Sequence, residues 1–174
     1  MAKLYFRYGA MNSGKSTALM QVAHNYEEQG MRVLILKPKV DTKGSGDLVS
    51  RLGVRRPADL LVPPDILHAE QAEQLFMVTV ELNIPVICYG LRSDFSLKGF
   101  PGSTRLLELA HTIEEMKTIC TCGRKATCNC RKVNGRFVFE GEQVAIDLEN
   151  DVQYVSMCPQ CYFRERSAFY AARR

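Results

Sequence analysis

The 174-residue sequence has no long hydrophobic run, because each of its apolar stretches is only a few residues long. A membrane-spanning helix needs about 20 consecutive apolar residues, so the sequence predicts no membrane span. The first seven residues also lack the apolar core of a signal peptide, which predicts a cytoplasmic protein. Internal repeats and low-complexity segments are absent, which excludes a repeat architecture. The net charge of +4 is too small for a histone-like or strongly anion-seeking protein.

What the sequence does contain is typical of a folded domain. Hydrophobic residues make up 46% and charged residues 24%, a balance that offsets the entropy of ordering the chain and excludes extensive disorder. The length suits one domain, or one domain with a small appendage. Six of the seven cysteines lie between residues 120 and 161. In a reducing compartment such clustering indicates a metal site more often than disulfides.

The N-terminal part of the chain predicts a parallel sheet. Residues 4–8 form a short apolar and aromatic run that is typical of a strand and leads into Gly9. From residue 16 to residue 29 the apolar positions recur at helical spacing, and Gly30 ends the predicted helix. Residues 33–36 are continuously apolar, as expected for a strand that is buried on both faces. This order of elements predicts an α/β fold.

Further elements follow towards residue 118. Residues 41–58 are polar and predict a mobile loop, whereas residues 68–82 predict a helix. The run at 84–91 is the strongest signal for a buried strand in the chain. Ser103 is predicted to cap a helix whose apolar positions extend to Ile113.

Residues 9–16 read Gly-Ala-Met-Asn-Ser-Gly-Lys-Ser and match the phosphate-binding pattern G-x-x-x-x-G-K-[ST]. Glycines let the backbone N–H groups of such a loop converge on phosphate oxygens at the start of a helix. Lys15 supplies a charge for the β- and γ-phosphates, and Ser16 offers a hydroxyl to Mg²⁺. A glycine-rich turn with a surface lysine is the alternative. The motif predicts a nucleoside triphosphate site made of Gly9, Ala10, Met11, Asn12, Ser13, Gly14, Lys15 and Ser16.

The clustered cysteines form three close pairs, which are Cys120 with Cys122, Cys128 with Cys130, and Cys158 with Cys161. Two such pairs on turns are typical of a tetrahedral structural zinc site. Spacing alone leaves open which pairs bind, and free or redox-active thiols are the alternative to zinc. Four thiolates around Zn²⁺ would leave two negative charges, which we expect the nearby cations Arg124, Lys125, Arg131 and Lys132 to offset.

The rise in cysteine content after Ile119 places a predicted domain boundary near residue 118. Residues 1–118 are then the P-loop α/β core, and residues 119–163 are a small zinc-binding domain. Residues 164–174 form a basic tail that we expect to be frayed. Cys88 lies in an apolar run and is predicted to be a core residue.

Five segments occur once each along the chain, in a characteristic order. They are the P-loop strand, Tyr89-Gly90-Leu91-Arg92-Ser93-Asp94-Phe95, Phe100-Pro101-Gly102-Ser103, Lys117-Thr118-Ile119-Cys120 and the four-cysteine ribbon. In this combination the chain resembles, over nearly its whole length, the type II thymidine kinases with a zinc-bearing lasso domain. The resemblance implies a RecA-like parallel sheet core with a C-terminal zinc-ribbon or lasso domain. It implies transfer of the γ-phosphate of ATP to the 5′-hydroxyl of thymidine, which gives dTMP and ADP for nucleotide salvage and DNA synthesis. It also implies Mg²⁺ with ATP, structural Zn²⁺, a cytoplasmic location and a homotetramer.

The resemblance also implies roles for individual residues. Residues 9–16 would bind ATP, with Lys15 acting in catalysis and Ser16 binding Mg²⁺. Arg51 falls where the family has an arginine near the transferred phosphoryl group, and a solvated loop charge is the alternative. The implied zinc ligands are Cys120, Cys122, Cys158 and Cys161. The implied thymidine contacts are Val144, Ala145, Ile146, Tyr154, Phe95 and Phe100, and packing in the core is the alternative for the three aromatic residues.

The sequence departs from this family at the catalytic base. The family carries an apolar strand that ends in Asp-Glu-x-Gln-Phe, whose Glu deprotonates the 5′-hydroxyl, and no such segment is present. The family pattern stops after residue 62 and resumes at residue 67, with a predicted join between Asp65 and Ile66. Glu70 and Glu73 lie on a polar helical stretch and are predicted to be solvated rather than to replace the base. Because loss of a central strand leaves two unpaired sheet edges, we interpret the chain as an internally shortened kinase.

Two other functions fit parts of the sequence. A zinc-ribbon P-loop ATPase that binds nucleic acid is suggested by the basic ribbon and tail, but the dense aromatic interleaving of single-strand binders is lacking. A non-catalytic nucleotide-binding scaffold is suggested by the absent glutamate. The sequence favours the kinase, with ATP and thymidine as partners and neither a membrane nor nucleic acid among them.

Overall fold

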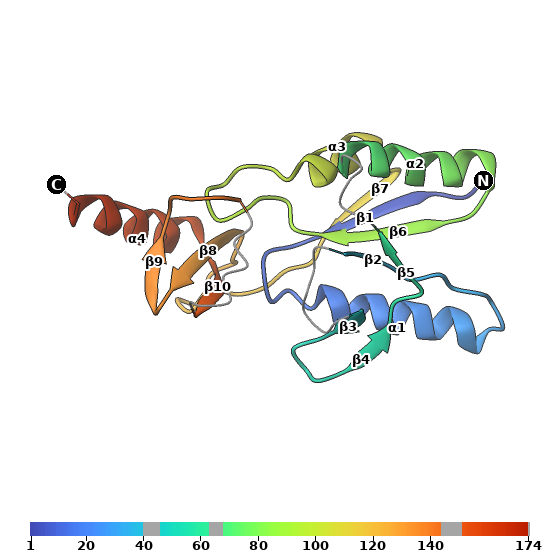
Figure 1. Cartoon of the computed structure of the whole chain (residues 1–174), viewed down its shortest axis with the longest axis horizontal. Helices are drawn as coiled ribbons and strands as arrows, with labels where there is room; N and C mark the ends of the chain where they lie inside the picture. The colour runs from blue at the N-terminus through green and yellow to red at the C-terminus, as the bar shows by residue number, and fades with distance from the viewer. Residues whose placement is uncertain (40–45, 63–67, 144–150, 174) are drawn as a thin grey trace.

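The computed structural model describes residues 1–39, 46–62, 68–143 and 151–173. The elements in these ranges are β1 (Leu4–Tyr8), α1 (Lys15–Glu28), β2 (Leu36–Pro38), β3 (Asp47–Val49), β4 (Arg55–Pro57), β5 (Leu60–Val62), α2 (His68–Glu81), β6 (Val86–Gly90), α3 (Pro101–Leu109), β7 (Thr112–Glu115), β8 (Cys128–Val133), β9 (Arg136–Val138), β10 (Val152–Met157) and α4 (Pro159–Ala171). Figure 1 shows β8, β9, β10 and α4 at one end of the molecule, away from the helices α1 and α2. No described helix combines the length and the apolar character that crossing a membrane requires.

The predicted parallel α/β core is confirmed. β1 is the central strand of a parallel sheet with the order β6-β1-β7. Its alternating residues Leu4 and Phe6 are both 0% exposed, because α2 and α3 cover one face of the sheet while α1 lies on the other (Figure 1). Parallel strands bring their carboxyl ends to one edge, so β1 and β6 end together beside the loop that starts at Gly9.

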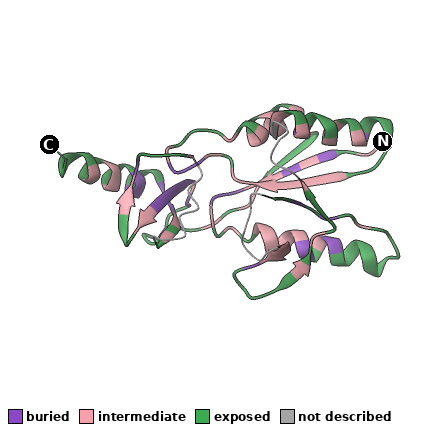
Figure 2. Cartoon of the chain, in the orientation of Figure 1, coloured by how far each residue is buried: buried purple, intermediate pink, exposed green. Residues whose placement is uncertain are grey.

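The sheet is interrupted beyond β6. β2 pairs in parallel with β5 alone, and no strand covers the outer edge of β6 in the described part of the chain. The prediction that residues 33–36 form a strand buried on both faces is wrong, since the strand begins at Leu36, and Leu34 and Leu36 are 66% and 37% exposed. The strand predicted at 84–91 is confirmed as β6, but its residues are only half-buried (Figure 2). The unpaired edges of β6 and of the β2–β5 pair in the described part of the chain are those that an absent strand would leave.

The predicted loop at 41–58 is partly regular structure. Residues 40–45 lie outside the described residues, but β3 and β4 pair as an antiparallel hairpin. Its turn is closed by a hydrogen bond from the Gly53 N–H to the Ser50 carbonyl (3.2 Å), and Gly53 has a φ of 85°. Glycine adopts this left-handed conformation without the Cβ strain of other residues. The turn glycine is visible in the sequence, but the polar residues around it give no apolar pattern from which β3 and β4 could be predicted.

Two details of the third helix differ from prediction. Phe100 stands at its N-cap and Pro101 is its first residue, so Ser103 lies inside the helix rather than capping it. Proline suits this first position because its N–H would be unpaired there anyway. The helix ends at Leu109, and Ile113 lies on β7, beside Phe6 of β1. The helical spacing of Ile113 is therefore coincidental.

The C-terminal part is an antiparallel sheet with the order β10-β8-β9, packed against α4. Residues 164–174 were predicted to be frayed, but α4 continues to Ala171. Phe139 explains why, since its ring meets those of Tyr162 and Phe169 at 5.3 and 5.7 Å. Arg173 lies over the Phe169 ring and pairs with Glu140, which holds the end of the helix to the sheet. Predicted helices 16–29 and 68–82 are confirmed as α1 and α2.

Candidate functional site

The P-loop lies between the end of β1 and the start of α1, as its motif requires. Asn12 and Gly14 have φ angles of 65° and 80°, so the loop turns sharply before the helix begins. The Gly9 N–H donates to the Gly90 carbonyl of β6 at 3.2 Å. A Cβ at Gly9 would come within 2.4 Å of the Met116 carbonyl oxygen, so this close approach of two backbones requires glycine.

Lys15, the motif lysine, points into this loop. Its Nζ donates to the carbonyl oxygens of Gly9 (3.0 Å) and Ala10 (2.7 Å) and to the Ser13 hydroxyl (3.1 Å). Burial lowers the pKa of Lys15 to about 8, because desolvation disfavours the ammonium ion. Ser16 follows in the first turn of α1. The arrangement holds a cation and a row of helix-start N–H groups at one place, which suits a polyphosphate.

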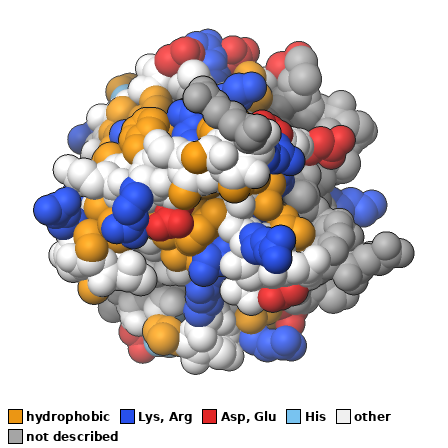
Figure 3. Space-filling view, turned by 90° about the vertical axis from the view of Figure 1, so that its left-hand side faces the viewer, with side chains coloured by type: hydrophobic (Ala, Val, Ile, Leu, Met, Phe, Trp, Pro, Cys, Tyr) orange, Lys and Arg blue, Asp and Glu red, His pale blue; other side chains and the backbone are white. Residues whose placement is uncertain are grey.

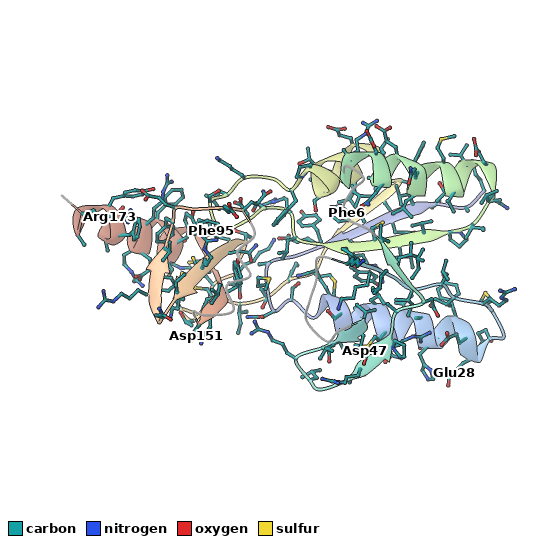
Figure 4. All side chains as sticks on the ribbon, viewed as in Figure 1. Phe6, Glu28, Asp47, Phe95, Asp151 and Arg173 are labelled. Carbon is teal, nitrogen blue, oxygen red and sulfur yellow. The ribbon has the colours of Figure 1, made fainter. Side chains whose placement is uncertain are left out.

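The other predicted substrate residues come from several different elements of the fold. Arg51 is exposed in the turn between β3 and β4, and within the described residues it has neither a hydrogen bond nor an ion pair. Phe95 is 1% exposed and lies beside the C-terminal sheet (Figure 4). Phe100 is half-buried at the start of α3, and Tyr154 is half-buried on β10 opposite Arg131. Val144, Ala145 and Ile146 lie outside the described residues.

The structure also brings together one set of four cysteines. The sulfur atoms of Cys120, Cys122, Cys158 and Cys161 all lie within 4.8 Å of one another. A Zn–S bond of about 2.3 Å implies sulfurs about 3.8 Å apart in a tetrahedral site. The Cys122 and Cys158 sulfurs are 3.6 Å apart, so the four cysteines fit a metal. The ligand set that the resemblance implied, and that spacing left open, is thus the one that the fold assembles.

The third cysteine pair does not join this cluster. Cys128 and Cys130 are buried on β8, and the Cys130 sulfur lies 3.3 Å from the Met157 sulfur. Burial raises the pKa of Cys130 to about 12, which keeps it a neutral thiol at physiological pH. In the metal cluster, burial opposes ionisation of Cys120, but hydrogen bonds from the backbones of Cys122 and Cys158 outweigh it and lower the Cys120 pKa to about 6.

Three of the four cations that were expected to offset the thiolate charge have other partners in the structure. Lys125 pairs with Glu115 on β7, and Lys132 lies over the Phe137 ring at 4.6 Å. Arg131 is 4% exposed, stacks on the Phe95 ring at 3.7 Å and donates to the carbonyls of Glu140 (2.7 Å) and Glu142 (2.8 Å). Arg164, outside this group, donates to Glu165 at 3.1 Å, and this hydrogen bond is the main cause of its raised pKa.

Sequence reasoning missed the residues that tie the loop at 93–99 to the C-terminal sheet. Arg131 holds the Phe95 ring, and the buried Tyr162 hydroxyl donates to the Phe95 carbonyl at 2.8 Å. Asn129, 3% exposed, donates from Nδ2 to the Ser93 carbonyl at 2.8 Å. These contacts join residues 36 to 67 positions apart in the chain, and no local motif signals them.

The two candidate acids of α2, Glu70 and Glu73, are both exposed. Glu73 accepts from Arg105 of α3 at 2.9 Å and is largely solvated. α2 packs on α3, on the face of the sheet opposite α1 (Figure 1). The prediction that Glu70 and Glu73 are helix-surface residues is therefore consistent with their placement.

Known proteins match nearly the whole chain. The family model "Thymidine kinase" matches residues 2–63 and 65–162. The chain is 42% identical to a thymidine kinase of Chromobacterium violaceum, with 95% of the chain and 100% of the relative covered. It is also 42% identical to one of Ruegeria pomeroyi, with 91% and 92% covered. A thymidine kinase of Idiomarina loihiensis is 44% identical, with 91% and 94% covered.

These alignments also contain positions that this chain lacks. The comparison with the Chromobacterium violaceum protein runs over 186 positions, whereas 95% of 174 residues is about 165 residues of this chain. About twenty positions of that relative therefore have no counterpart here. The family match is itself interrupted at residue 64, next to the predicted join between Asp65 and Ile66, which lies outside the described residues. Both findings support an internal shortening.

Proposed function

Because the chain belongs to the thymidine kinase family, we propose that it transfers the γ-phosphate of ATP to the 5′-hydroxyl of thymidine, giving dTMP and ADP for nucleotide salvage and DNA synthesis. The observation that carries the proposal is the P-loop at the end of β1, with Lys15 aimed into it. Incubation of the protein with MgATP and thymidine should release ADP and dTMP in equal amounts. ADP release that does not depend on thymidine would contradict the proposal.

We assign the chemistry of the nucleotide to the P-loop. Residues 9–16 bind the triphosphate, Ser16 contributes a ligand to Mg²⁺, and Lys15 neutralises charge on the transferring phosphoryl group. Arg51 approaches that group from the β3–β4 turn once ATP is bound. Mg²⁺ held by Ser16 and the nucleotide would neutralise negative charge on the phosphates.

We assign the nucleoside to residues on both sides of the proposed domain boundary near residue 118. Phe95 and Phe100, from the core before residue 118, and Tyr154 with residues 144–146, from the part after it, are the proposed thymidine contacts. Zn²⁺ on Cys120, Cys122, Cys158 and Cys161 stabilises the ribbon. A homotetramer and a cytoplasmic location complete the proposal, since free thiols suit a reducing compartment.

A second candidate, an ATPase that binds nucleic acid through the ribbon, is disfavoured by the surface. Lys and Arg side chains at this end of the molecule are spread out with Asp and Glu between them (Figure 3). A nucleic-acid site would gather them into a continuous basic patch. A DNA affinity that falls steeply with salt would favour the ATPase.

Lys15→Ala should lower kcat as well as weaken MgATP, because the lysine charge also stabilises the transferring phosphoryl group. A change in KM alone would mean that Lys15 only tethers ATP.

The affinity of the wild type for MgATP should fall about tenfold between pH 8 and pH 9.5, because Lys15 with a pKa of about 8 must take up a proton to bind the phosphates. Calorimetry in two buffers of different ionisation enthalpy would measure this uptake at pH 8.5. Lys15→Ala is the control and should show none.

A further inference from the structure

A buried amide in the C-terminal sheet reaches the nucleotide loop. Asn129 lies on β8 between two buried cysteines and is 3% exposed. Its Oδ1 accepts the Met11 N–H of the P-loop at 2.7 Å, across 118 positions of the chain. Its Nδ2 donates to the Ser93 carbonyl at 2.8 Å. One side chain therefore bridges the P-loop and the loop that follows β6.

From these contacts, we propose that Asn129 is a positioning residue that fixes the P-loop in its nucleotide-binding conformation and couples it to the loop at 93–99. The proposal rests on the proposed function, because it takes residues 9–16 as the ATP site.

The chemistry of the bridge requires an amide. Met11 offers a donor and Ser93 an acceptor, so the residue between them needs one acceptor and one donor on a short, planar group. An aspartate keeps the acceptor for Met11 but loses the donor and repels the Ser93 carbonyl. A leucine of similar size supplies neither, and each loop is left with a buried polar group unpaired.

The bridge also explains the shape of the P-loop. The Met11 N–H is committed to Asn129, so it does not face a phosphate. The next residue, Asn12, then takes a left-handed φ of 65°, and this turn directs the following N–H groups towards the start of α1. Asn12 has a second tie to the C-terminal side, since its carbonyl accepts from the Thr118 hydroxyl at 3.4 Å. The loop that holds the triphosphate is thus shaped from outside its own strand and helix.

The coupling has a consequence for the other substrate. Ser93 begins the segment whose Phe95 is held by Arg131 and Tyr162. A crevice of about 10 Å³ lies here, and its lining includes Gly9, Ser93 and Asn129. One amide therefore couples the P-loop to the segment that carries a proposed thymidine contact.

The test compares Asn129→Leu with the wild type and with Ser156→Ala as a matched control. Ser156 is the cross-strand partner of Asn129 on β10, and it is 6% exposed. Hydrogen exchange of the peptide covering residues 9–16 is measured without nucleotide, together with MgATP affinity, metal content and Tm. We expect Asn129→Leu to speed this exchange about tenfold and to lower the affinity for MgATP about tenfold, with the metal content unchanged. Ser156→Ala should stay close to the wild type in both exchange and affinity.

Asn129→Asp separates the two halves of the bridge and serves if the leucine variant does not fold. It should leave exchange at residues 9–16 slow and speed exchange at 91–99. Wild-type exchange at residues 9–16 in Asn129→Leu, or equal effects of Asn129→Leu and Ser156→Ala, would overturn the positioning role. Failure of the wild type to bind MgATP would refute the proposed function instead, and the exchange data would still decide the role of Asn129.

Discussion

A chain that carries an apolar strand ending in Asp-Glu-x-Gln-Phe between Asp65 and Ile66 should phosphorylate thymidine at least ~100-fold faster than the present chain. A positioned general base contributes about 10²–10⁴-fold, or about 3–5 kcal/mol of activation free energy. Glu70 and Glu73 of α2 are exposed, and Glu73 pairs with Arg105, so we expect neither to act as this base. Steady-state kcat/KM for thymidine, measured for both chains at saturating MgATP, checks this.

The same insertion should repair the sheet. Among the described residues, β6 and β2 each have an unpaired edge, and Leu34, Leu60 and Leu61 in or next to β2 and β5 are 66%, 51% and 41% exposed. A parallel strand that is apolar on both faces would pair these edges and cover these side chains. The Tm should rise, and amide exchange in β6 should slow.

A control insert with Gln in place of the Glu separates the two effects. It should raise the Tm as much as the intact insert does, while the rate stays near that of the present chain. Full activity of the present chain that is abolished by Glu70→Gln would contradict the prediction. In that case α2 would carry the base, and the alignment across residues 60–70 would need revision.

Local signals were sufficient for the core of the fold. The strand before Gly9, the helix from Lys15 and the helix from His68 follow from short-range periodicity, because one face of each packs against the central sheet. The P-loop is equally local, since one motif carries the turn, the lysine and the helix start. The sequence could not decide between cysteine pairs, because the sulfurs that meet come from segments about 36 residues apart.

Other parts depend on contacts that the sequence does not display. Residues 164–174 are predicted to fray, but Phe139, which follows β9, packs on Tyr162 and Phe169 of α4. In the sequence Arg131 is one of several cations in the ribbon, and only the fold shows that its guanidinium group stacks on the Phe95 ring. The prediction of a buried strand at 33–36 is wrong for a different reason. Its apolar residues would be buried in a complete sheet, whereas the sheet of this chain is interrupted beside them.

Cys158→Ser should abolish metal binding and unfold much of the C-terminal sheet. Five of the nine buried residues in the core of this part are cysteines, so its packing supplies little hydrophobic free energy without a metal. Structural zinc sites contribute about 10–16 kcal/mol at neutral pH. Elemental analysis should find about one zinc per chain in the wild type and none in the variant.

The loss of metal should then reach both substrates by different paths. The nucleoside KM should rise first, because Arg131 of this sheet and Tyr162 of α4 hold the loop of Phe95. MgATP should weaken as well, through the contact between Asn129 and Met11. Cys128→Ser is the matched control, since it changes a buried thiol of the same sheet that lies outside the metal cluster, and it should keep the zinc. Zinc-free Cys158→Ser protein with wild-type nucleoside affinity would show that the metal does not support the substrate site. If the nucleoside affinity fell while the MgATP affinity did not change, the metal would influence only the loop at 93–99. The conformation of the P-loop would then depend on β1 and α1 alone.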